Sequence, residues 1–553
     1  MNKFKSMAMM AALMCPMFIS AQNPFSIAED DTSSTRDIYG YDSRREAKTY
    51  DYRGYTQAVL TQMHQEDFKD NQVYGYTLEQ SLKNQYKTDV DPNLRFKDQP
   101  AFGNCTGFLI APNIMVTAAH CISSDNHIIT NGVVEYHKPS QDKYADFDYK
   151  DWKWIFDYTN DISMTKKNHK DLGDYYVATI PSGNQYRVKR VLKSVMDWNN
   201  LIDYAVIELD RETSREPFRF RTGYRIAKGD NLAMIGSPYG VPLKLSDGAK
   251  VTMNSGSHWF GTNLDAFGGN SGGPVYNTAG SALIEGILVR GRIDKGAKGY
   301  YLDKTCNCVK ETKYENTDAE SILDDYGIPV DLKSTEVQRI TSIPLNIKVR
   351  AVYNNFSYAI RNNDEKRFED YLIYNWIFTQ DTAEWITGEL GSEDLLGRLA
   401  LKNNRTEMFK TFIDEGMDCA LKHESGRTML YYAIEKGNQE AIDYILMQGY
   451  NLEQKDDYGN TPIFWAIDQY NGSAAEAIIK NGGSLSARNS SGDTPLHAAI
   501  RAGSYSMVER LIQGGASWSA TTGSEGYDAI KLAKKLKRKE IKKYLKKVKK
   551  GKV

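Results

Sequence analysis

The chain has 553 residues, which at about 150 residues per domain suggests roughly three or four folded units. Charged residues make up 25% and hydrophobic residues 41%, a balance that excludes collagen-like, wholly disordered and polytopic membrane proteins. The 70 Lys and Arg nearly cancel the 71 Asp and Glu, so the formal net charge of -1 gives no reason to expect nucleic acid as a partner.

The first 21 residues predict an export signal. Lys3 and Lys5 precede a nearly unbroken apolar run at 7–19, and small residues end the segment around Ala21. Such a run is too short to cross a bilayer as a stable helix, and the whole pattern is typical of a secretory signal peptide. We expect cleavage after Ala21 and a periplasmic or secreted protein, in which disulfides can form.

Residues 22–94 are polar and rich in tyrosine, with little periodicity before the stretch 55–63. Two interpretations stay open for this segment. It is either a removable pro-segment or a strand-and-helix wrapper around the domain that follows.

A histidine comes directly after a predicted strand hairpin. Residues 108–110 and 114–117 are expected to be short strands joined by a Pro-Asn turn, which places His120 at the edge of a cleft. Cys105 and Cys121 flank this loop. In an exported protein we expect them to form a disulfide, worth about 3 kcal/mol in the chain-entropy model, that pins the strand before His120.

Two further segments complete a candidate catalytic set. Asp203 opens the apolar strand predicted at 202–209, whereas its rival Asp161 is followed by polar residues. Ser271 lies within Gly-Gly-Asn-Ser-Gly-Gly-Pro at 268–274. Glycines on both sides of a serine permit a tight turn that exposes the hydroxyl and points neighbouring N–H groups at one place.

These residues together predict nucleophilic catalysis. The Ser271 hydroxyl needs a base to take its proton, and the His120 imidazole can do so near neutral pH. Asp203 would fix the tautomer of the histidine and stabilise its charged form. The backbone N–H groups of Gly269 and Ser271 would bind the oxyanion.

The motifs Val-Thr-Ala-Ala-His-Cys, ending at Cys121, and Gly-Asn-Ser-Gly-Gly-Pro, starting at Gly269, resemble those of trypsin/chymotrypsin-like serine peptidases. The second motif is closer to the bacterial branch, which includes glutamyl endopeptidases. The resemblance covers residues 95–345 and implies two packed six-stranded β-barrels, a catalytic cleft between them, a protein or peptide substrate and no cofactor. An α/β-hydrolase is excluded, because its catalytic histidine follows the serine and the only later histidines lie in a repeat region.

The resemblance also suggests which residues surround the substrate side chain. Asp265 and Ala266 precede the nucleophile by six and five residues, and Leu288 follows it by seventeen. Glutamyl endopeptidases carry a histidine where Leu288 stands. Asp265 would favour Arg or Lys in the substrate, and the other two residues suit an apolar side chain, so we expect no preference for acidic residues. Asn270 replaces the aspartate that pairs with a freshly cut N-terminus in pancreatic enzymes, so that route of activation is not expected.

The remaining cysteines give no metal site. Cys306 and Cys308 form either a local bridge or bonds elsewhere, and Cys419 is expected to be a buried thiol. No Cys/His set stands at the spacing of zinc ligands, so we expect no metal.

A period of 33 residues marks the last third of the chain. Gly-x-Thr recurs at 426, 459 and 492, and the copy beginning Gly-Asp-Thr-Pro-Leu-His-Ala-Ala at Gly492 resembles the ankyrin repeat, a β-turn followed by two antiparallel helices. We expect residues 346–553 to form an all-α ankyrin solenoid with atypical terminal copies. Its function would be recognition of a protein partner, or simply packing against the peptidase.

The last 23 residues hold 13 basic residues and one acidic residue, a net charge of +12. Residues 22–530 then carry 55 basic and 70 acidic residues, a net charge of -15. This basic end is interpreted as a capping helix or as a helix that docks on an anionic surface.

Two functions remain open for the whole chain: an exported serine endopeptidase with a recognition array, or a peptidase-like binding protein that no longer cuts.

Overall fold

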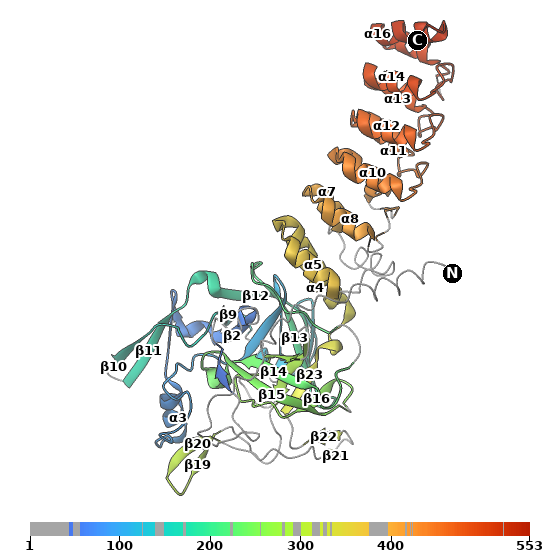
Figure 1. The fold of residues 1–553 in the computed structure, drawn as a ribbon. Coiled ribbons are helices and arrows are strands. Elements are labelled where there is room, and N and C mark those ends of the chain that lie inside the picture. The colour runs from blue at the N-terminus through green and yellow to red at the C-terminus, as the bar shows by residue number, and fades with distance from the viewer. Residues whose placement is uncertain are drawn as a thin grey trace, which may run out of the picture. The chain divides into compact units, whose positions relative to one another are not determined.

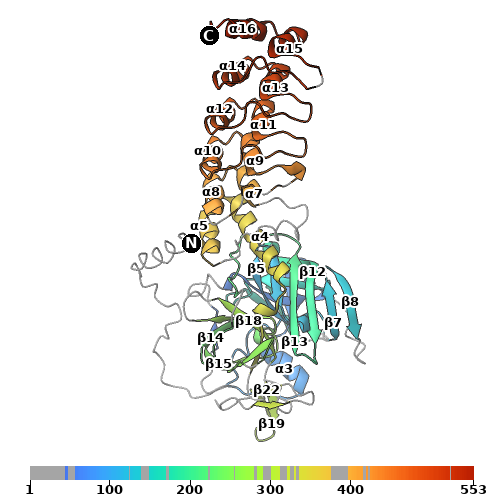
Figure 2. The same ribbon diagram turned by 90° about the vertical axis from the view of Figure 1, so that its right-hand side faces the viewer.

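The computed structural model describes residues 44–47 and 56–552, except for 124, 139–148, 170–172, 222–224, 255, 279–282, 291–299, 312–320, 324–328, 332–334, 375–395, 415–416, 418, 421, 423 and 524. The predicted signal peptide and most of the segment 22–55 lie outside these residues. The chain divides into two compact units, Met1–Ala351 and Val352–Val553, and the division falls within α4 (Leu345–Asn362). Figures 1 and 2 show a first unit built of strands and a second built of helix pairs.

Six strands of the described chain close into the first antiparallel barrel, in which β12 pairs with both β9 and β13. Their order around the barrel is β13 (Ile202–Leu209), β6 (Ile114–Thr117), β5 (Thr106–Ala111), β2 (Val59–His64), β9 (Trp152–Phe156) and β12 (Gln185–Asp197). The hairpin β7 (Asn126–Thr130) and β8 (Val133–Lys138) extends the sheet from β12. Seven of the eight residues of β13 are buried, because one face lines the barrel and the other packs towards β18 and β23 of the second barrel.

The second barrel also consists of six described strands. Its order is β15 (Lys244–Met253), β14 (Asn231–Gly236), β17 (Pro274–Asn277), β18 (Ile284–Arg290), β23 (Thr335–Arg339) and β16 (Trp259–Thr262), and β16 pairs back with β15. A buried apolar core runs through both barrels and includes Phe108, Tyr276 and Ile287. The expected double barrel is confirmed.

The segment before residue 95 contributes to both barrels. β2 is one of the six strands of the first barrel, and β1 (Arg45–Glu46) pairs with β15 of the second. Arg44 is buried and forms a 2.6 Å ion pair with Glu311. The double barrel therefore includes residues that precede the expected boundary at 95, and removal of the whole segment 22–94 would take away a barrel strand.

Smaller elements complete the first unit. The short helix α3 (Leu78–Tyr86) carries a Thr77 cap. A four-stranded sheet contains β3 (Phe68–Lys69), β4 (Gln72–Gly75), β10 (Met164–His169) and β11 (Gly173–Thr179). Two hairpins follow, β19 (Tyr300–Asp303) with β20 (Cys308–Glu311), and β21 (Ser321–Leu323) with β22 (Pro329–Asp331).

The second unit is a stack of antiparallel helix pairs (Figure 2). After α4 and α5 (Glu365–Tyr374), the described pairs are α7 (Leu396–Lys402) and α8 (Thr406–Asp414), α9 (Met429–Lys436) and α10 (Gln439–Met447), α11 (Pro462–Asp468) and α12 (Gly472–Lys480), α13 (Pro495–Ala502) and α14 (Tyr505–Gln513), and α15 (Ala529–Lys535) and α16 (Lys539–Lys549). The recurring Gly459 and Gly492 have φ of +77° and +73°, a region that favours glycine, which explains the visible period. The expected ankyrin solenoid is confirmed.

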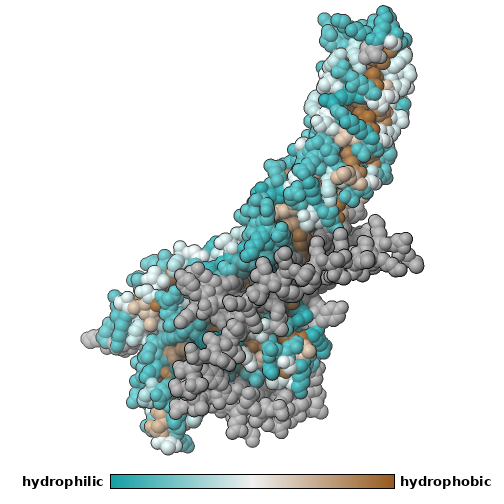
Figure 3. Space-filling view, in the orientation of Figure 1, coloured by the Kyte–Doolittle hydropathy of each residue, from teal (hydrophilic) through white to brown (hydrophobic). Residues whose placement is uncertain are grey.

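The last helix has two different sides. Its apolar residues Ile541, Tyr544 and Leu545 are buried, whereas most of its lysines are exposed. Figure 3 shows hydrophilic residues over much of the visible face of the described helices, with hydrophobic residues along part of it. Within the described part of the chain, no helix combines the length and the apolar character that a membrane span requires.

Candidate active site

The imidazole of His120 meets the carboxylate of Asp203. His120 lies on the short 3-10 helix Ala119–Cys121, directly after β6, and Asp203 is the second residue of β13, which pairs with β6. Nδ1 of His120 is 2.7 Å from Oδ2 of Asp203. The Asp203 side chain is 0% exposed and that of His120 is 25% exposed, so one end of the pair is buried and the other reaches the surface.

Asp203 also holds the backbone around the histidine. Its Oδ1 accepts hydrogen bonds from the N–H groups of Ala119 (2.7 Å) and His120 (3.2 Å). Its own N–H donates to Oε1 of Gln338 at 3.0 Å, a contact that comes from the second barrel. The carboxylate thus fixes both the ring and the main chain of the histidine loop.

The buried carboxylate remains easy to ionise. Burial alone would raise the pKa of Asp203, but the attraction and hydrogen bond of His120, together with the charge of Arg290, outweigh it and lower the pKa below the usual range. An ionised Asp203 can only accept hydrogen bonds, so Nδ1 of His120 carries the proton and Nε2 is left to act as a base.

The turn that carries Ser271 tolerates only glycine at two positions. Gly269 and Gly272 have φ of +91° and +86°. A Cβ at Gly272 would lie 2.0 Å from the carbonyl oxygen of Thr106. Thr106 itself anchors the turn, because its N–H donates to the carbonyl of Ser271 and its hydroxyl donates to the carbonyl of Gly269, both at 2.8 Å. The serine is thereby tied to the start of β5 in the first barrel.

The backbone N–H groups of Gly269 and Ser271 have no protein acceptor among the described residues. The N–H groups that follow each of them are bonded, since Asn270 donates to Phe267 (3.0 Å) and Gly272 donates to Leu288 (2.7 Å). Unused, fixed N–H groups beside a nucleophile are what stabilisation of an oxyanion requires.

The serine lies beside the histidine loop without a hydrogen bond to it. The carbonyl oxygen of Ser271 is 3.6 Å from Sγ of Cys121, the residue after His120. No hydrogen bond joins Oγ of Ser271 to His120 in the described structure. Such contacts commonly tighten only when substrate binds.

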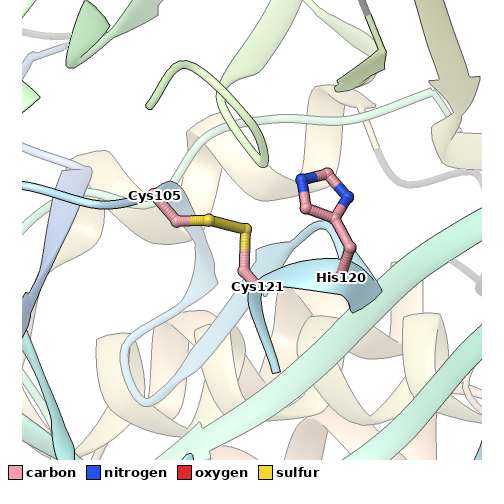
Figure 4. A group of neighbouring side chains, drawn as sticks. All are labelled: Cys105, His120 and Cys121. Atoms are coloured by element: carbon pink, nitrogen blue, oxygen red, sulfur yellow. A yellow bond between two sulfur atoms is a disulfide. The ribbon is translucent and has the colours of Figure 1, made fainter. Parts of the chain in front are cut away.

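A disulfide joins Cys105 and Cys121 beside the histidine (Figure 4). It connects the residue before β5 to the helix that carries His120. The ligand atoms of these three residues lie within 4.8 Å of one another. Both sulfurs are bonded to each other, however, and neither offers the thiolate that a metal ion would need.

The residues predicted to line the substrate pocket lie at different depths. Asp265 is buried, and Ala266 is partly buried against the core of the second barrel. The side chain of Leu288 belongs to that core, and its backbone bonds to Gly272 and Gly273 hold the nucleophile turn. Their effect on specificity stays a prediction.

The other sequence candidates have their own local surroundings. Asp161 is exposed and accepts a hydrogen bond from Thr159. Cys306 and Cys308 form a local disulfide, and Cys419 is a buried thiol.

Sequence reasoning missed three residues of the second barrel: Arg290 and Gln338, which contact Asp203, and Glu336, which pairs with Arg290. Nη1 of Arg290 lies 4.0 Å from Oδ2 of Asp203, and its Nε pairs with Glu336. No local motif marks these residues. Gln338 is 135 residues from Asp203 in the chain, so only the docking of the two barrels brings them together.

The two units match two known families. Residues 105–283 match the trypsin-like peptidase domain. Residues 357–456, 396–489 and 444–522 match ankyrin repeats in sets of three copies. No curated protein matches the chain.

Proposed function

Because the chain joins a trypsin-like peptidase domain to C-terminal ankyrin repeats, we propose that it is an exported serine endopeptidase acting through Ser271, His120 and Asp203. The observation that carries this proposal is the His120–Asp203 pair, with its carboxylate buried, beside a turn in which the N–H groups of Gly269 and Ser271 are unused. The alternative, a binding protein that has lost activity, gives no reason for those N–H groups to remain unsatisfied.

The reaction follows from the placement of these groups. Oγ of Ser271 attacks the carbonyl carbon of the substrate while Nε2 of His120 takes its proton. The N–H groups of Gly269 and Ser271 bind the resulting oxyanion. His120 then gives the proton to the leaving amine, and water attacks the acyl-enzyme by the same steps in reverse order.

A peptide library tests both activity and specificity. We expect cleavage by the wild type, loss of cleavage in Ser271→Ala, and a preference for basic or apolar residues before the cut bond. The reason is that Asp265 would favour a basic side chain, Ala266 and Leu288 suit an apolar one, and Leu288 stands where glutamate-specific enzymes carry a histidine. Cleavage mainly after Glu would refute the proposed specificity, and no cleavage of any peptide would support the binding protein.

We propose that the ankyrin array binds the protein to be cut or a protein regulator. Tyr458 and Tyr470 support this role, because their side chains are 58% and 64% exposed and aromatic residues are enriched where proteins bind one another. A Tyr458→Ser/Tyr470→Ser variant should cut folded protein substrates more slowly and short peptides at the normal rate. Tyr136→Ser, which changes an exposed tyrosine of the peptidase unit, is the matched control. Equal loss with both substrate types would contradict the role.

The proposed location is outside the cytoplasm. The signal at 1–21 supports it, and N-terminal sequencing of protein recovered from the periplasm or medium should begin at Gln22. Protein that stays in the cytoplasm with Met1 intact would exclude export.

The basic C-terminus is proposed to contact an anionic surface. The apolar side of α16 is already buried, so this contact would be electrostatic and would not insert into lipid. Binding to vesicles with anionic lipid should weaken as salt increases and should be reduced in Lys543→Glu/Lys547→Glu. Binding that ignores salt and both substitutions would contradict the proposal.

A further inference from the structure

A buried ion pair of the second barrel lies next to Asp203. Arg290 ends β18 and Glu336 belongs to the neighbouring strand β23. Nε of Arg290 is 2.5 Å from Oε2 of Glu336, and the two side chains are 10% and 0% exposed. Water therefore screens this pair poorly, and its charges act strongly on whatever lies beside it.

The positive end of the pair faces the first barrel. Nη1 of Arg290 is 4.0 Å from Oδ2 of Asp203, the same oxygen that bonds to His120. Nη2 of Arg290 donates to the carbonyl of Leu201 at 3.3 Å, two residues before that aspartate. Glu336 pairs with Nε of the same guanidinium. Asp203 thus sits between two groups that carry or can carry positive charge.

We propose that Arg290 is a positioning residue that holds Asp203 as an anion and opposes the charging of His120, and that Glu336 limits this effect. The inference rests on the proposed catalytic role of His120 and Asp203. The cation stabilises the carboxylate and repels a second positive charge on the imidazole. The pair from the second barrel therefore sets the pH range in which His120 can act as a base.

The other charged groups near this pair do not supply the same effect. His127, on β7, is fully buried, and its two ring nitrogens contact the carbonyl of Asp125 and the hydroxyl of Ser194. Burial lowers the pKa of His127, which favours its neutral form. The carboxylate of Asp125 pairs with His137 at 3.1 Å.

Two variants should shift the pH profile in opposite directions. Glu336→Gln removes the negative partner and leaves Arg290 fully positive, so His120 should lose its proton at a lower pH. The double variant Arg290→Met/Glu336→Gln removes both charges, so His120 should keep its proton to a higher pH. Substitutions that only disturb the packing of the site would not shift the pH profile in opposite directions.

The matched control is the pair formed by Arg221 and Glu285, whose side chains are 24% and 1% exposed and which are joined by two hydrogen bonds. Glu285 lies on the same strand as Arg290. The variant Arg221→Met/Glu285→Gln should lower stability without moving the profile.

The experiment measures the rate of labelling by a fluorophosphonate between about pH 5 and pH 9 in each variant. A shift of about half a pH unit changes the rate on the acid limb by about threefold. We expect Glu336→Gln to label faster than wild type there and the double variant to label more slowly. Shifts in the same direction, or the same profile in all variants, would overturn the inference.

A second measurement needs no activity. NMR titration of the His120 ring, assigned by comparison with His120→Ala, gives its midpoint in Ser271→Ala protein with and without the same substitutions. If the wild type is not labelled, the proposed function fails, and the NMR midpoints still decide the role of Arg290. Opposite displacements support it, and midpoints that agree with the control variant refute it.

Discussion

Asp203→Asn should abolish most activity through the tautomer of His120. The carboxylate accepts from Nδ1 of His120 at 2.7 Å and from two backbone N–H groups at 2.7 Å and 3.2 Å. An asparagine at this place keeps its oxygen on the two backbone donors and turns its NH₂ group towards Nδ1. Nδ1 must then accept, the proton moves to Nε2, and the histidine loses the lone pair with which it would take the proton of Ser271.

The expected loss in labelling or peptide cleavage is on the order of 10⁴-fold, the size found when a triad histidine is held in the wrong tautomer. Stability should fall by about 2–4 kcal/mol, because charge-assisted hydrogen bonds to a buried carboxylate are replaced by neutral ones. The assay compares single-turnover labelling with urea unfolding of the same samples. Asp161→Asn is the matched control, since Asp161 is exposed and contacts Thr159. Full activity in Asp203→Asn, with loss in Asp161→Asn, would refute the assignment.

Three other substitutions test separate parts of the structure. Gly272→Ala should lower the free energy of unfolding by more than about 2 kcal/mol and abolish nearly all labelling, because its Cβ would lie 2.0 Å from a carbonyl oxygen. Its control is Gly248→Ala, which is also at positive φ but has nothing within 4 Å of the added Cβ and should lower the free energy of unfolding by about 1 kcal/mol. Arg44→Met removes the 2.6 Å ion pair with the largely buried Glu311 and should cost about 3–5 kcal/mol in urea unfolding, most of it recovered in Arg44→Met/Glu311→Gln; an unchanged midpoint in the single variant would show that this ion pair does not stabilise the fold. Because the pKa of Asp203 is lowered in the folded protein, its ionisation stabilises the fold above the unfolded carboxyl pKa of about 3.9, and this stabilisation is lost as the pH falls through the folded pKa. The difference in free energy of unfolding between wild type and Asp203→Asn should therefore shrink below about pH 4. A difference that stays constant down to about pH 2 would contradict this prediction.

The candidate catalytic residues could be found from sequence because each stands in a short local pattern. His120 follows a strand, Asp203 opens one, and Ser271 lies among glycines that its turn needs at positive φ. The ankyrin period was visible for the same physical reason, since a left-handed residue recurs in each copy.

The strand β2 could not be recognised in the same way. Five of its six residues are buried, including two polar ones, Thr61 and Gln62. A strand buried on both faces shows no alternation of polar and apolar residues, and the polar ones hide it further. This is why the start of the peptidase unit was expected too late in the chain.

Arg290, Glu336 and Gln338 could not be predicted because their chemistry depends on long-range placement. Each lies on a strand of the second barrel, and each acts on a residue of the first or on a neighbour that does. A charged residue at the end of a strand is normally solvated, and nothing in the local sequence indicates that a second barrel will cover it.

The most direct test is the mass of the intact protein after treatment with a fluorophosphonate. We predict one adduct per chain in the wild type, located at Ser271, and none in Ser271→Ala or after mild unfolding. A wild type that stays unmodified at every pH, or an adduct that persists in Ser271→Ala, would contradict the proposal that this chain is a serine peptidase.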